Sequence, residues 1–225
     1  ILTEIPEVDV LLTGHQHRRL NLVTRNTAIV QPGYRGEAVA KVILNIDDKS
    51  KKIESMSTEL IDTKDYEPDK KIVAIVKDLD KNTQKWLDQP IAQLNKSAPI
   101  GNAMKARLVG APFINLLQQM QLYFTKADVS ATAVMSETAK GFGKKVTMRD
   151  VLLNYPYSNQ LCRVKLTGKE LKHIIEYSLS FLKKDQSGKI GFKDRWIKPK
   201  PMLYHFDVFY PVKYKADISK PEGHR

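Results

Sequence analysis

The sequence predicts a mixed α/β fold, of the α+β kind, in which two units of short strands and helices are joined by a helical linker. Three observations lead to this class. Short apolar runs typical of strands occupy residues 1–62, apolar positions recur at helical spacing from residue 69 to residue 87, and helix-like and strand-like segments alternate from residue 112 onward. A chain of 225 residues with 42% hydrophobic residues can bury a core, because single domains run to roughly 100–200 residues.

The strands predicted in residues 1–62 are short and end in polar turns. Residues 8–17 (V-D-V-L-L-T-G-H-Q-H) run from a buried strand into a turn, and residues 28–36 (A-I-V-Q-P-G-Y-R-G) do the same. Residues 39–46 alternate, with every second side chain apolar, as in a sheet packed on one face. Residues 52–60 return as a polar, edge-like strand. A strand this close to the first residue needs neighbours, so we expect the chain to be a fragment of a longer protein.

A linker and a long helix are predicted between the two units. Residues 63–71 are rich in charge and contain Pro68, which suits a linker that leads into a helix. From Asp69 the apolar residues follow a helical stripe, and Pro90 ends it. We therefore expect an interdomain helix of about 20 residues.

The second unit is predicted to begin with a helix opened by Pro112, because proline suits the first helical position. The helix predicted later begins with T-G-K-E, a capping box in which the Thr167 hydroxyl and the Glu170 carboxylate satisfy free N–H groups. In chain order, the pattern predicts a strand at 128–135, a helical turn from 147, a break at 155–159, a strand at 161–166, a helix over 167–182, a basic surface segment at 183–201, and a hairpin of 204–208 with 212–218.

Composition excludes several classes of protein. A single cysteine, Cys162, excludes a disulfide scaffold and a zinc site made of cysteines. No apolar run approaches the roughly 20 residues that cross a bilayer, so no membrane span is predicted. The net charge of +12 would suit a protein that binds nucleic acid without chemistry. The basic residues are spread along the chain, however, so we favour a solvated surface and predict no specific nucleic-acid partner.

The G-H-Q-H turn at residues 14–17 is the one local pattern with a chemical reason behind it. Imidazole is the commonest metal ligand at neutral pH, and the glycine lets the backbone bend close to an ion. Spacing alone leaves two interpretations open, a metal site formed by His15 and His17 or two histidines in a solvated loop. The other histidines have no carboxylate cluster near them in the sequence, so further ligands would have to precede Ile1. These other histidines are His173, His205 and His224.

The motifs together resemble a known family. Residues 8–17 are similar to the last metal-binding motif of the calcineurin-like metallophosphoesterases, and residues 31–36 resemble the following loop in the 5'-nucleotidase and 2',3'-cyclic-nucleotide 2'-phosphodiesterase family. Residues 154–171 (N-Y-P-Y-S-N-Q-L-C-R-V-K-L-T-G-K-E-L) and residues 204–214 resemble that family's C-terminal substrate-binding domain. The resemblance covers nearly the whole chain. It implies the closing strands of a metallophosphoesterase β-sandwich at 1–62, a linker and interdomain helix at 63–95, and a truncated nucleotide-binding domain of the 5'-nucleotidase C-terminal type at 96–225.

The resemblance also implies a function, that of a secreted, periplasmic or cell-surface hydrolase in nucleotide catabolism. The expected activity is that of a bifunctional 2',3'-cyclic-nucleotide 2'-phosphodiesterase/3'-nucleotidase, with 2',3'-cyclic nucleotides and 3'-nucleotides as substrates. His15 and His17 would bind two divalent ions (Mn, Zn, Mg or similar), which clamp phosphoryl oxygens and activate water. Tyr157 would stack on the nucleobase, and the second aromatic residue of that clamp would follow Arg225. No catalytic residue is predicted in the chain, and two histidines cannot hold two ions, so the fragment alone is expected to be inactive.

The sequence departs from the family pattern in two places. Residues 136–141 (S-E-T-A-K-G) replace the arginine-ended phosphate loop of the better-known nucleotidases, which favours the cyclic-phosphodiesterase branch over a strict 5'-nucleotidase. Arg35 stands where the family leads us to expect an aromatic residue. A 5'-nucleotidase or other nucleotide phosphohydrolase remains the alternative enzyme, and a basic nucleotide- or nucleic-acid-binding module remains the alternative without catalysis.

A few other residues are candidates with a more ordinary interpretation. Arg107, Lys144 and Lys145 would suit contact with phosphate, although we favour solvated surface for the two lysines. Three aromatic residues near the C-terminus are expected to be core residues rather than part of the base clamp. These are Tyr204, Phe206 and Tyr214.

Overall fold

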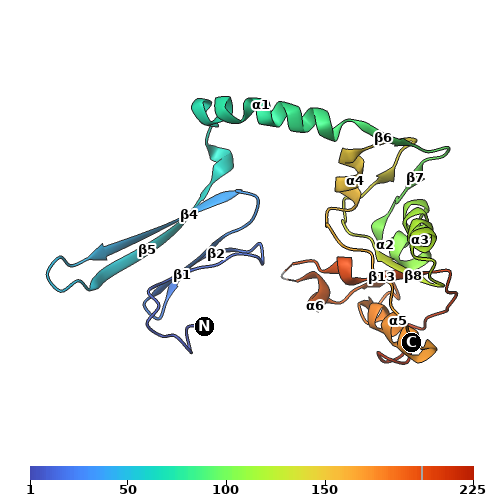
Figure 1. Cartoon of the computed structure of the whole chain (residues 1–225). Coiled ribbons are helices and arrows are strands. Elements are labelled where there is room, and N and C mark those ends of the chain that lie inside the picture. Colours follow the sequence, from blue (N-terminus) through green and yellow to red (C-terminus); the bar gives the residue numbers. More distant parts are fainter. Residues whose placement is uncertain (199) are drawn as a thin grey trace. The chain divides into compact units, whose positions relative to one another are not determined.

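The computed structural model of the chain describes residues 1–198 and 200–225 and confirms the mixed α/β class (Figure 1). It contains two compact units, residues 1–76 and residues 77–225. The division falls within a single helix, α1 (Lys70–Leu87). The domain boundaries predicted after residues 62 and 95 stay predictions. In the part of the chain that the structure describes, no helix combines the length and the apolar character needed to cross a membrane.

The first unit is built from two small sheets. In the first sheet, β3 lies between β1, to which it is parallel, and β2, to which it is antiparallel. The second sheet is a long antiparallel ribbon of β4 and β5 (Figure 1). The bounds are β1 Val10–Leu12, β2 Arg19–Thr24, β3 Thr27–Pro32, β4 Ala38–Ile46 and β5 Ile53–Asp62, followed by a short 3₁₀ turn at Thr63–Asp65. The strands predicted in residues 1–62 are therefore confirmed.

Alternation in β4 sorts its side chains as the pattern predicts. Ala40, Val42 and Leu44 are half-buried, while Val39 and Ile43 on the opposite face are exposed. The best-buried strand is β3, where Ala28, Val30 and Gln31 are closed to solvent. The core of this unit is therefore small and centred on β3, the strand that leads into residues 33–36.

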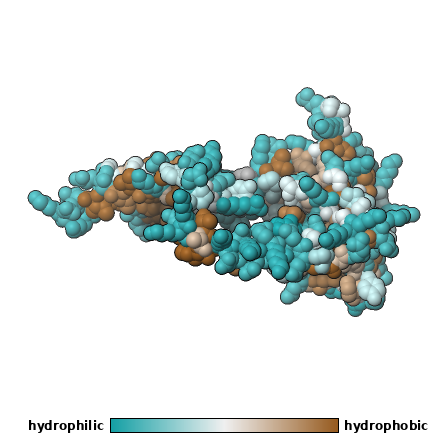
Figure 2. Space-filling view, turned by 90° about the horizontal axis from the view of Figure 1, so that it is seen from above, coloured by the Kyte–Doolittle hydropathy of each residue, from teal (hydrophilic) through white to brown (hydrophobic). Residues whose placement is uncertain are grey.

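Helix α1 confirms the predicted linker helix, but its apolar stripe is open to solvent. The Asp69 carboxylate caps its start by accepting hydrogen bonds from the N–H groups of Lys71 at 2.8 Å and Ile72 at 3.0 Å. No residue of the helix is buried, and Leu79 is 70% exposed. In the space-filling view, brown hydrophobic side chains interrupt the teal surface in several places (Figure 2).

The described residues of the second unit form helices and four antiparallel strand pairs. The helices are α2 (Ala103–Val109), α3 (Pro112–Thr125), α4 (Met148–Asn154), α5 (Gly168–Leu179) and α6 (Asp194–Ile197), with a 3₁₀ turn at Leu203–His205. The pairs are β6 (Pro90–Gln93) with β10 (Lys145–Thr147), β7 (Ala98–Pro99) with β9 (Gly141–Phe142), β8 (Ser130–Ala133) with β13 (Asp207–Tyr210), and β11 (Leu182–Lys184) with β12 (Ile190–Phe192).

Local sequence signals explain where the helices of this unit begin. Pro112 stands at the first turn of α3, as predicted. The capping box of α5 is confirmed, because the Thr167 hydroxyl accepts from the Glu170 N–H at 3.3 Å and the Glu170 carboxylate accepts from the Thr167 N–H at 2.7 Å. Thr147 and Asp150 form a second capping box at α4, where the predicted helical turn lies.

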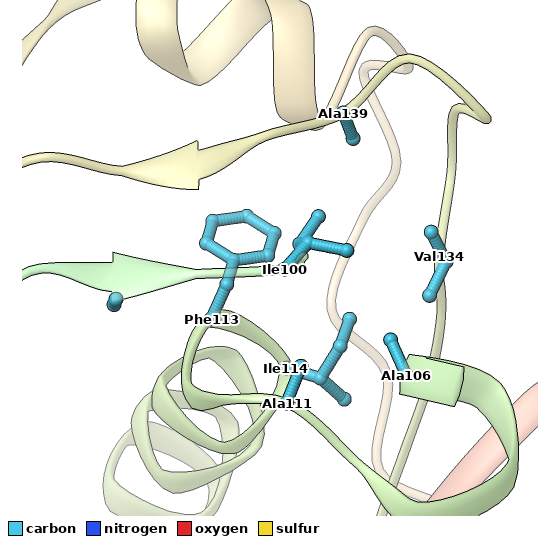
Figure 3. Packing of buried hydrophobic residues seen from close by; sticks show 8 residues of the cluster. Ile100, Ala106, Ala111, Phe113, Ile114, Val134 and Ala139 are labelled. Carbon is cyan, nitrogen blue, oxygen red and sulfur yellow. The ribbon is translucent and has the colours of Figure 1, made fainter. Parts of the chain in front are cut away.

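Where the structure describes the second unit, two hydrophobic clusters form its core. In the first, Phe113 and Ile114 of α3 pack against Ile100, Ala106 and Val134 (Figure 3). The second cluster lies between α5, the hairpin of β11 and β12, and β13. Its buried members are Ile175, Leu179, Phe181, Leu182, Leu203, Phe206, Phe209 and Ile218.

Two predictions near the C-terminus, one of a strand and one of a hairpin, are wrong. Residues 161–166, all described, form no strand, and no backbone–backbone hydrogen bond holds them to another described residue. Residues 204–208 and 212–218, all of them described, do not form a hairpin, because β13 pairs with the distant β8 instead. Alternation reports an amphipathic segment, but not its partner. The segment predicted as basic surface at 183–201 is exposed at residues 183–189, whereas apolar residues of β12 and α6, such as Phe192 and Trp196, are half-buried against the second cluster; Pro199 lies outside the described residues.

Candidate functional site

The G-H-Q-H turn lies directly after β1, at the carboxyl end of the parallel pair formed by β1 and β3. The Thr13 N–H donates to the Val30 carbonyl at 2.9 Å, and the Thr13 hydroxyl donates to the same oxygen at 3.1 Å. On the other side of the turn, the Gly33 N–H donates to the Arg18 carbonyl at 3.0 Å. Both ends of the turn are thus attached to β3 and to the loop that follows it.

Gln31 holds the middle of the turn. Its amide nitrogen Nε2 donates to the Gly14 carbonyl at 2.6 Å and lies 3.3 Å from the Gln16 Oε1, and its Oε1 accepts from the Arg18 N–H at 3.1 Å. Gln31 is only 2% exposed. A buried amide with several partners is costly to disrupt, because each group left unpaired loses about 1–3 kcal/mol.

Both histidines of the turn have a left-handed backbone, with φ of 69° at His15 and 57° at His17. Non-glycine residues in this region cost of the order of 1–3 kcal/mol each, and they persist only where the surroundings hold them. Both side chains are exposed. The loop therefore presents two imidazoles to solvent at a cost in local conformational energy.

The ring of His17 stacks on the ring of Tyr34, with centroids 4.8 Å apart and planes inclined by 11°. The guanidinium of Arg35 lies over the Tyr34 ring, 5.5 Å from its centroid. Arg35 is exposed. The motif Q-P-G-Y-R-G thus places the Tyr34 ring against His17 and the Arg35 guanidinium beside the Tyr34 ring.

These residues fit part of a metal site. Two accessible imidazoles, each with a ring nitrogen to donate, are suitable ligands for divalent transition ions. Within residues 1–198 and 200–225, no group of three or more His, Cys, Asp or Glu side chains is gathered as a metal site would require. This turn therefore offers two accessible imidazoles and no larger ligand set among the described residues.

Tyr157, the candidate for base stacking, follows α4 in the loop of residues 155–159. Tyr157 is 43% exposed, and the centroid of its ring lies 5.6 Å from that of Tyr204, at an inclination of 54°. Asn154, at the end of α4, anchors the loop because its side chain exchanges two hydrogen bonds with the backbone of Gly141, at 2.6 and 3.0 Å. The loop that follows this anchored helix end thus carries an exposed tyrosine.

A cavity of about 600 Å³ opens beside the same loop, and Tyr157 is not part of its lining. Asn159, Cys162, Thr132 and Asp207 are among the residues that line it. Burial raises the pKa of the Asp207 carboxyl, and the charge of His205 opposes that rise. The Thr132 hydroxyl is buried and makes no hydrogen bond to any described residue.

The other candidates from the sequence occupy ordinary positions. Arg107 is buried and binds the Glu137 carboxylate and, at 3.1 Å, the Val134 carbonyl, so its role is structural. Phe206 is a core residue as predicted and Tyr204 is half-buried, whereas Tyr214 is 45% exposed, so its assignment to the core is wrong. The remaining candidates are exposed. They are Lys144, Lys145, His173 and His205.

Comparison with known proteins identifies relatives of both units. The family profile described as "5'-nucleotidase, C-terminal domain" matches residues 90–225. A 2',3'-cyclic-nucleotide 2'-phosphodiesterase/3'-nucleotidase of Haemophilus influenzae is 24% identical over 275 residues, which cover 98% of this chain and 40% of that protein. Endonuclease YhcR of Bacillus subtilis is 24% identical over 197 residues, 85% of this chain and 16% of that protein.

One solved structure is similar over the full length. It is a Staphylococcus aureus protein described as a 5'-nucleotidase, in complex with alpha-ketoglutarate, which superposes with a TM-score of 0.88 at 32% identity. The match covers 100% of this chain and 43% of that one. The chain thus spans less than half the length of each of these relatives.

Proposed function

Because residues 90–225 make this chain a member of the 5'-nucleotidase C-terminal domain family, we propose that it belongs to an enzyme that hydrolyses phosphate esters of nucleotides. Of the relatives named above, one is a cyclic-nucleotide phosphodiesterase/3'-nucleotidase, one is described as a 5'-nucleotidase and one is an endonuclease. More finely, we propose a metal-dependent 2',3'-cyclic-nucleotide 2'-phosphodiesterase/3'-nucleotidase. From the same resemblance we propose an extracellular, periplasmic or cell-surface location.

The observation that carries the proposal is the histidine turn. A loop held by Gln31 at the end of β1 presents His15 and His17 to solvent on a strained backbone, and such strain is common at functional sites. We assign both imidazoles as ligands of divalent ions. Such ions, when bound, stabilise the negative charge of phosphoryl oxygens.

Tyr157 supplies the proposed contact with the nucleobase. An aromatic face stacked on a base is worth about 1–3 kcal/mol and tolerates different bases. The residue is 43% exposed, which leaves a surface for such stacking. The boundaries of the linker, residues 63–95, and of the nucleotide-binding domain, residues 96–225, are part of the same proposal.

The metal assignment is tested by Mn²⁺-dependent hydrolysis of 2',3'-cyclic AMP. The natural protein that contains this chain is compared with its His15→Ala/His17→Ala double variant, and with His173→Ala as a control for loss of an exposed histidine. The double variant should lose more than about 100-fold in rate, since even the residues that support a metal ligand are worth about 10–100-fold. Equal rates in the wild type and the double variant would remove the metal assignment.

The base-stacking role is tested separately through KM. Tyr157→Ala should raise KM for 3'-AMP by about 5- to 150-fold, the equivalent of about 1–3 kcal/mol, while Tyr157→Phe should remain within about twofold of the wild type. An unchanged KM in Tyr157→Ala would mean that the ring does not contact the base.

The second candidate function is that of a 5'-nucleotidase, which the 32% identity to the Staphylococcus aureus protein favours. Parallel assays with 2',3'-cyclic AMP, 3'-AMP and 5'-AMP separate the two. Release of phosphate from 5'-AMP alone would favour the 5'-nucleotidase, and hydrolysis of the first two would favour the bifunctional enzyme.

A further inference from the structure

We infer that Gln31 and Tyr34 are positioning residues that hold the two imidazoles of the G-H-Q-H turn in the orientation in which they bind a divalent ion. The inference rests on the proposed role of His15 and His17 and assigns a task to two residues outside the turn. We call Gln31 and Tyr34 together the loop support.

Gln31 acts on the backbone of the turn. Its side chain contacts the first, third and fifth residues of the segment from Gly14 to Arg18, by donating to the Gly14 carbonyl and accepting from the Arg18 N–H. The two residues between these contact points are His15 and His17, the ones with positive φ. Without the amide, the turn would lose the contacts that offset its backbone strain, and both histidines would relax toward ordinary conformations.

Tyr34 acts on one side chain. A parallel stack with centroids 4.8 Å apart restricts rotation of the His17 ring, because an imidazole that rotates away loses the contact. Gln31 and Tyr34 belong to the same segment, which is attached to the turn again by the hydrogen bond from the Gly33 N–H to the Arg18 carbonyl, 3.0 Å long. Backbone and ring are therefore supported from one side.

A structural role alone does not account for Tyr34. Tyr34 is 44% exposed, so it adds little to the core of its unit. Its one stacking partner among the described residues is His17. Loss of the Tyr34 ring should therefore affect the orientation of the His17 imidazole far more than the stability of the unit.

The first test needs no metal. In NMR spectra of the full chain, the Tyr34 ring should shift the His17 ring protons upfield. Tyr34→Phe should keep this shift, Tyr34→Ala should abolish it, and Tyr66→Ala, which removes another exposed tyrosine of the same unit, should leave it unchanged. The same His17 shifts in Tyr34→Ala as in the wild type would overturn the inference.

The second test is titration of the same proteins with Zn²⁺, followed through the His15 and His17 ring signals. Residues that orient metal ligands are worth about 10–100-fold in affinity, so Tyr34→Ala should bind Zn²⁺ about tenfold more weakly than Tyr34→Phe. Gln31→Met, which keeps length but loses the amide, should weaken binding and speed amide exchange at Arg18. If urea unfolding shows that this variant does not fold, the comparison of Tyr34→Ala with Tyr34→Phe still tests the inference.

The outcomes separate the inference from the proposed function. Equal Zn²⁺ affinity in the wild type and in His15→Ala/His17→Ala would overturn the metal assignment, and with it the inference. Loss of binding in that double variant, together with unchanged affinity in Tyr34→Ala, would leave the metal assignment in place and overturn the positioning role.

Discussion

Replacing Asn154 with alanine should destabilise the second unit strongly, although the residue lies at the end of a helix. Asn154 is 3% exposed. Its Oδ1 accepts from the Gly141 N–H at 2.6 Å, and its Nδ2 donates to the carbonyls of Gly141 at 3.0 Å and Asp150 at 2.7 Å. The side chain thus pairs with a buried backbone in the way that a neighbouring strand would.

The expected loss follows from these contacts. Each hydrogen bond contributes about 0.5–1.5 kcal/mol net, and a buried group left without a partner costs about 1–3 kcal/mol. Alanine leaves both the N–H and the carbonyl of the buried Gly141 without the side chain that pairs them. The free energy of unfolding should therefore fall by about 2–5 kcal/mol.

Urea unfolding followed by tryptophan fluorescence measures this change, because both tryptophans, Trp86 and Trp196, lie in residues 77–225. Asn159→Ala is the matched control, since Asn159 is exposed and makes a single side-chain hydrogen bond, to the Tyr155 hydroxyl at 3.2 Å. The control should change stability by less than about 0.5 kcal/mol. A loss below about 1 kcal/mol in Asn154→Ala would refute the account of the buried amide.

Three further substitutions test other features of the second unit. Gly141→Ala places a Cβ 2.2 Å from a backbone carbonyl oxygen of β7 at a φ of 80°. The free energy of unfolding should therefore fall by at least about 2 kcal/mol, and a urea midpoint equal to that of the wild type would contradict this. Thr167→Ala removes the capping box and should cost about 1 kcal/mol, whereas Thr167→Ser should cost little; equal losses in both would argue against the cap. Hydrogen bonds from Lys183 and Lys198 lower the pKa of the Asp194 carboxyl to about 2 from 3.8. Because the folded pKa is the lower one, the stabilisation is present above pH 3.8 and is lost as the pH falls toward 2; an NMR titration should find the pKa near 3.8 in the Lys183→Met/Lys198→Met variant, and an unchanged low value would exclude the lysines as its cause.

Elements specified by neighbouring residues were predictable from the sequence. The capping box of Thr167 and Glu170 and the helix opened by Pro112 depend on contacts within a few residues. The strand before the histidine turn pairs with the more distant β3, but its short apolar run is itself a local signal. Their signals are local, so the sequence pattern contains them in full.

Pairing between distant segments was not predictable in the same way. Residues 161–166 and 212–218 alternate like strands, yet β13 pairs with β8, more than 70 residues earlier in the chain. The small side chains of β8, which include Ala131 and Ala133, allow that pairing, and alternation carries no information about it.

The candidate site shows the same division. The position of His15 and His17 at the end of a strand follows from the local pattern, whereas the contacts of Gln31 and Tyr34 with the turn depend on the register of β1 and β3. The motif Q-P-G-Y-R-G was visible as a loop, but its support of the histidines required the distances. The ion pair of the buried Arg107 with the exposed Glu137 was likewise hidden, because 30 residues separate its partners.

The unpaired stretch from Gln160 to Leu166 has a practical consequence for handling the protein. Exposed apolar side chains such as Leu161 and Val164, on a backbone without pairing partners among the described residues, favour association between molecules in concentrated solution. Arg163 and Lys165 interleave with them, and their mutual repulsion opposes such association while ionic strength is low. Concentrated stocks should therefore stay clear in dilute buffer and turn turbid as sodium chloride is added.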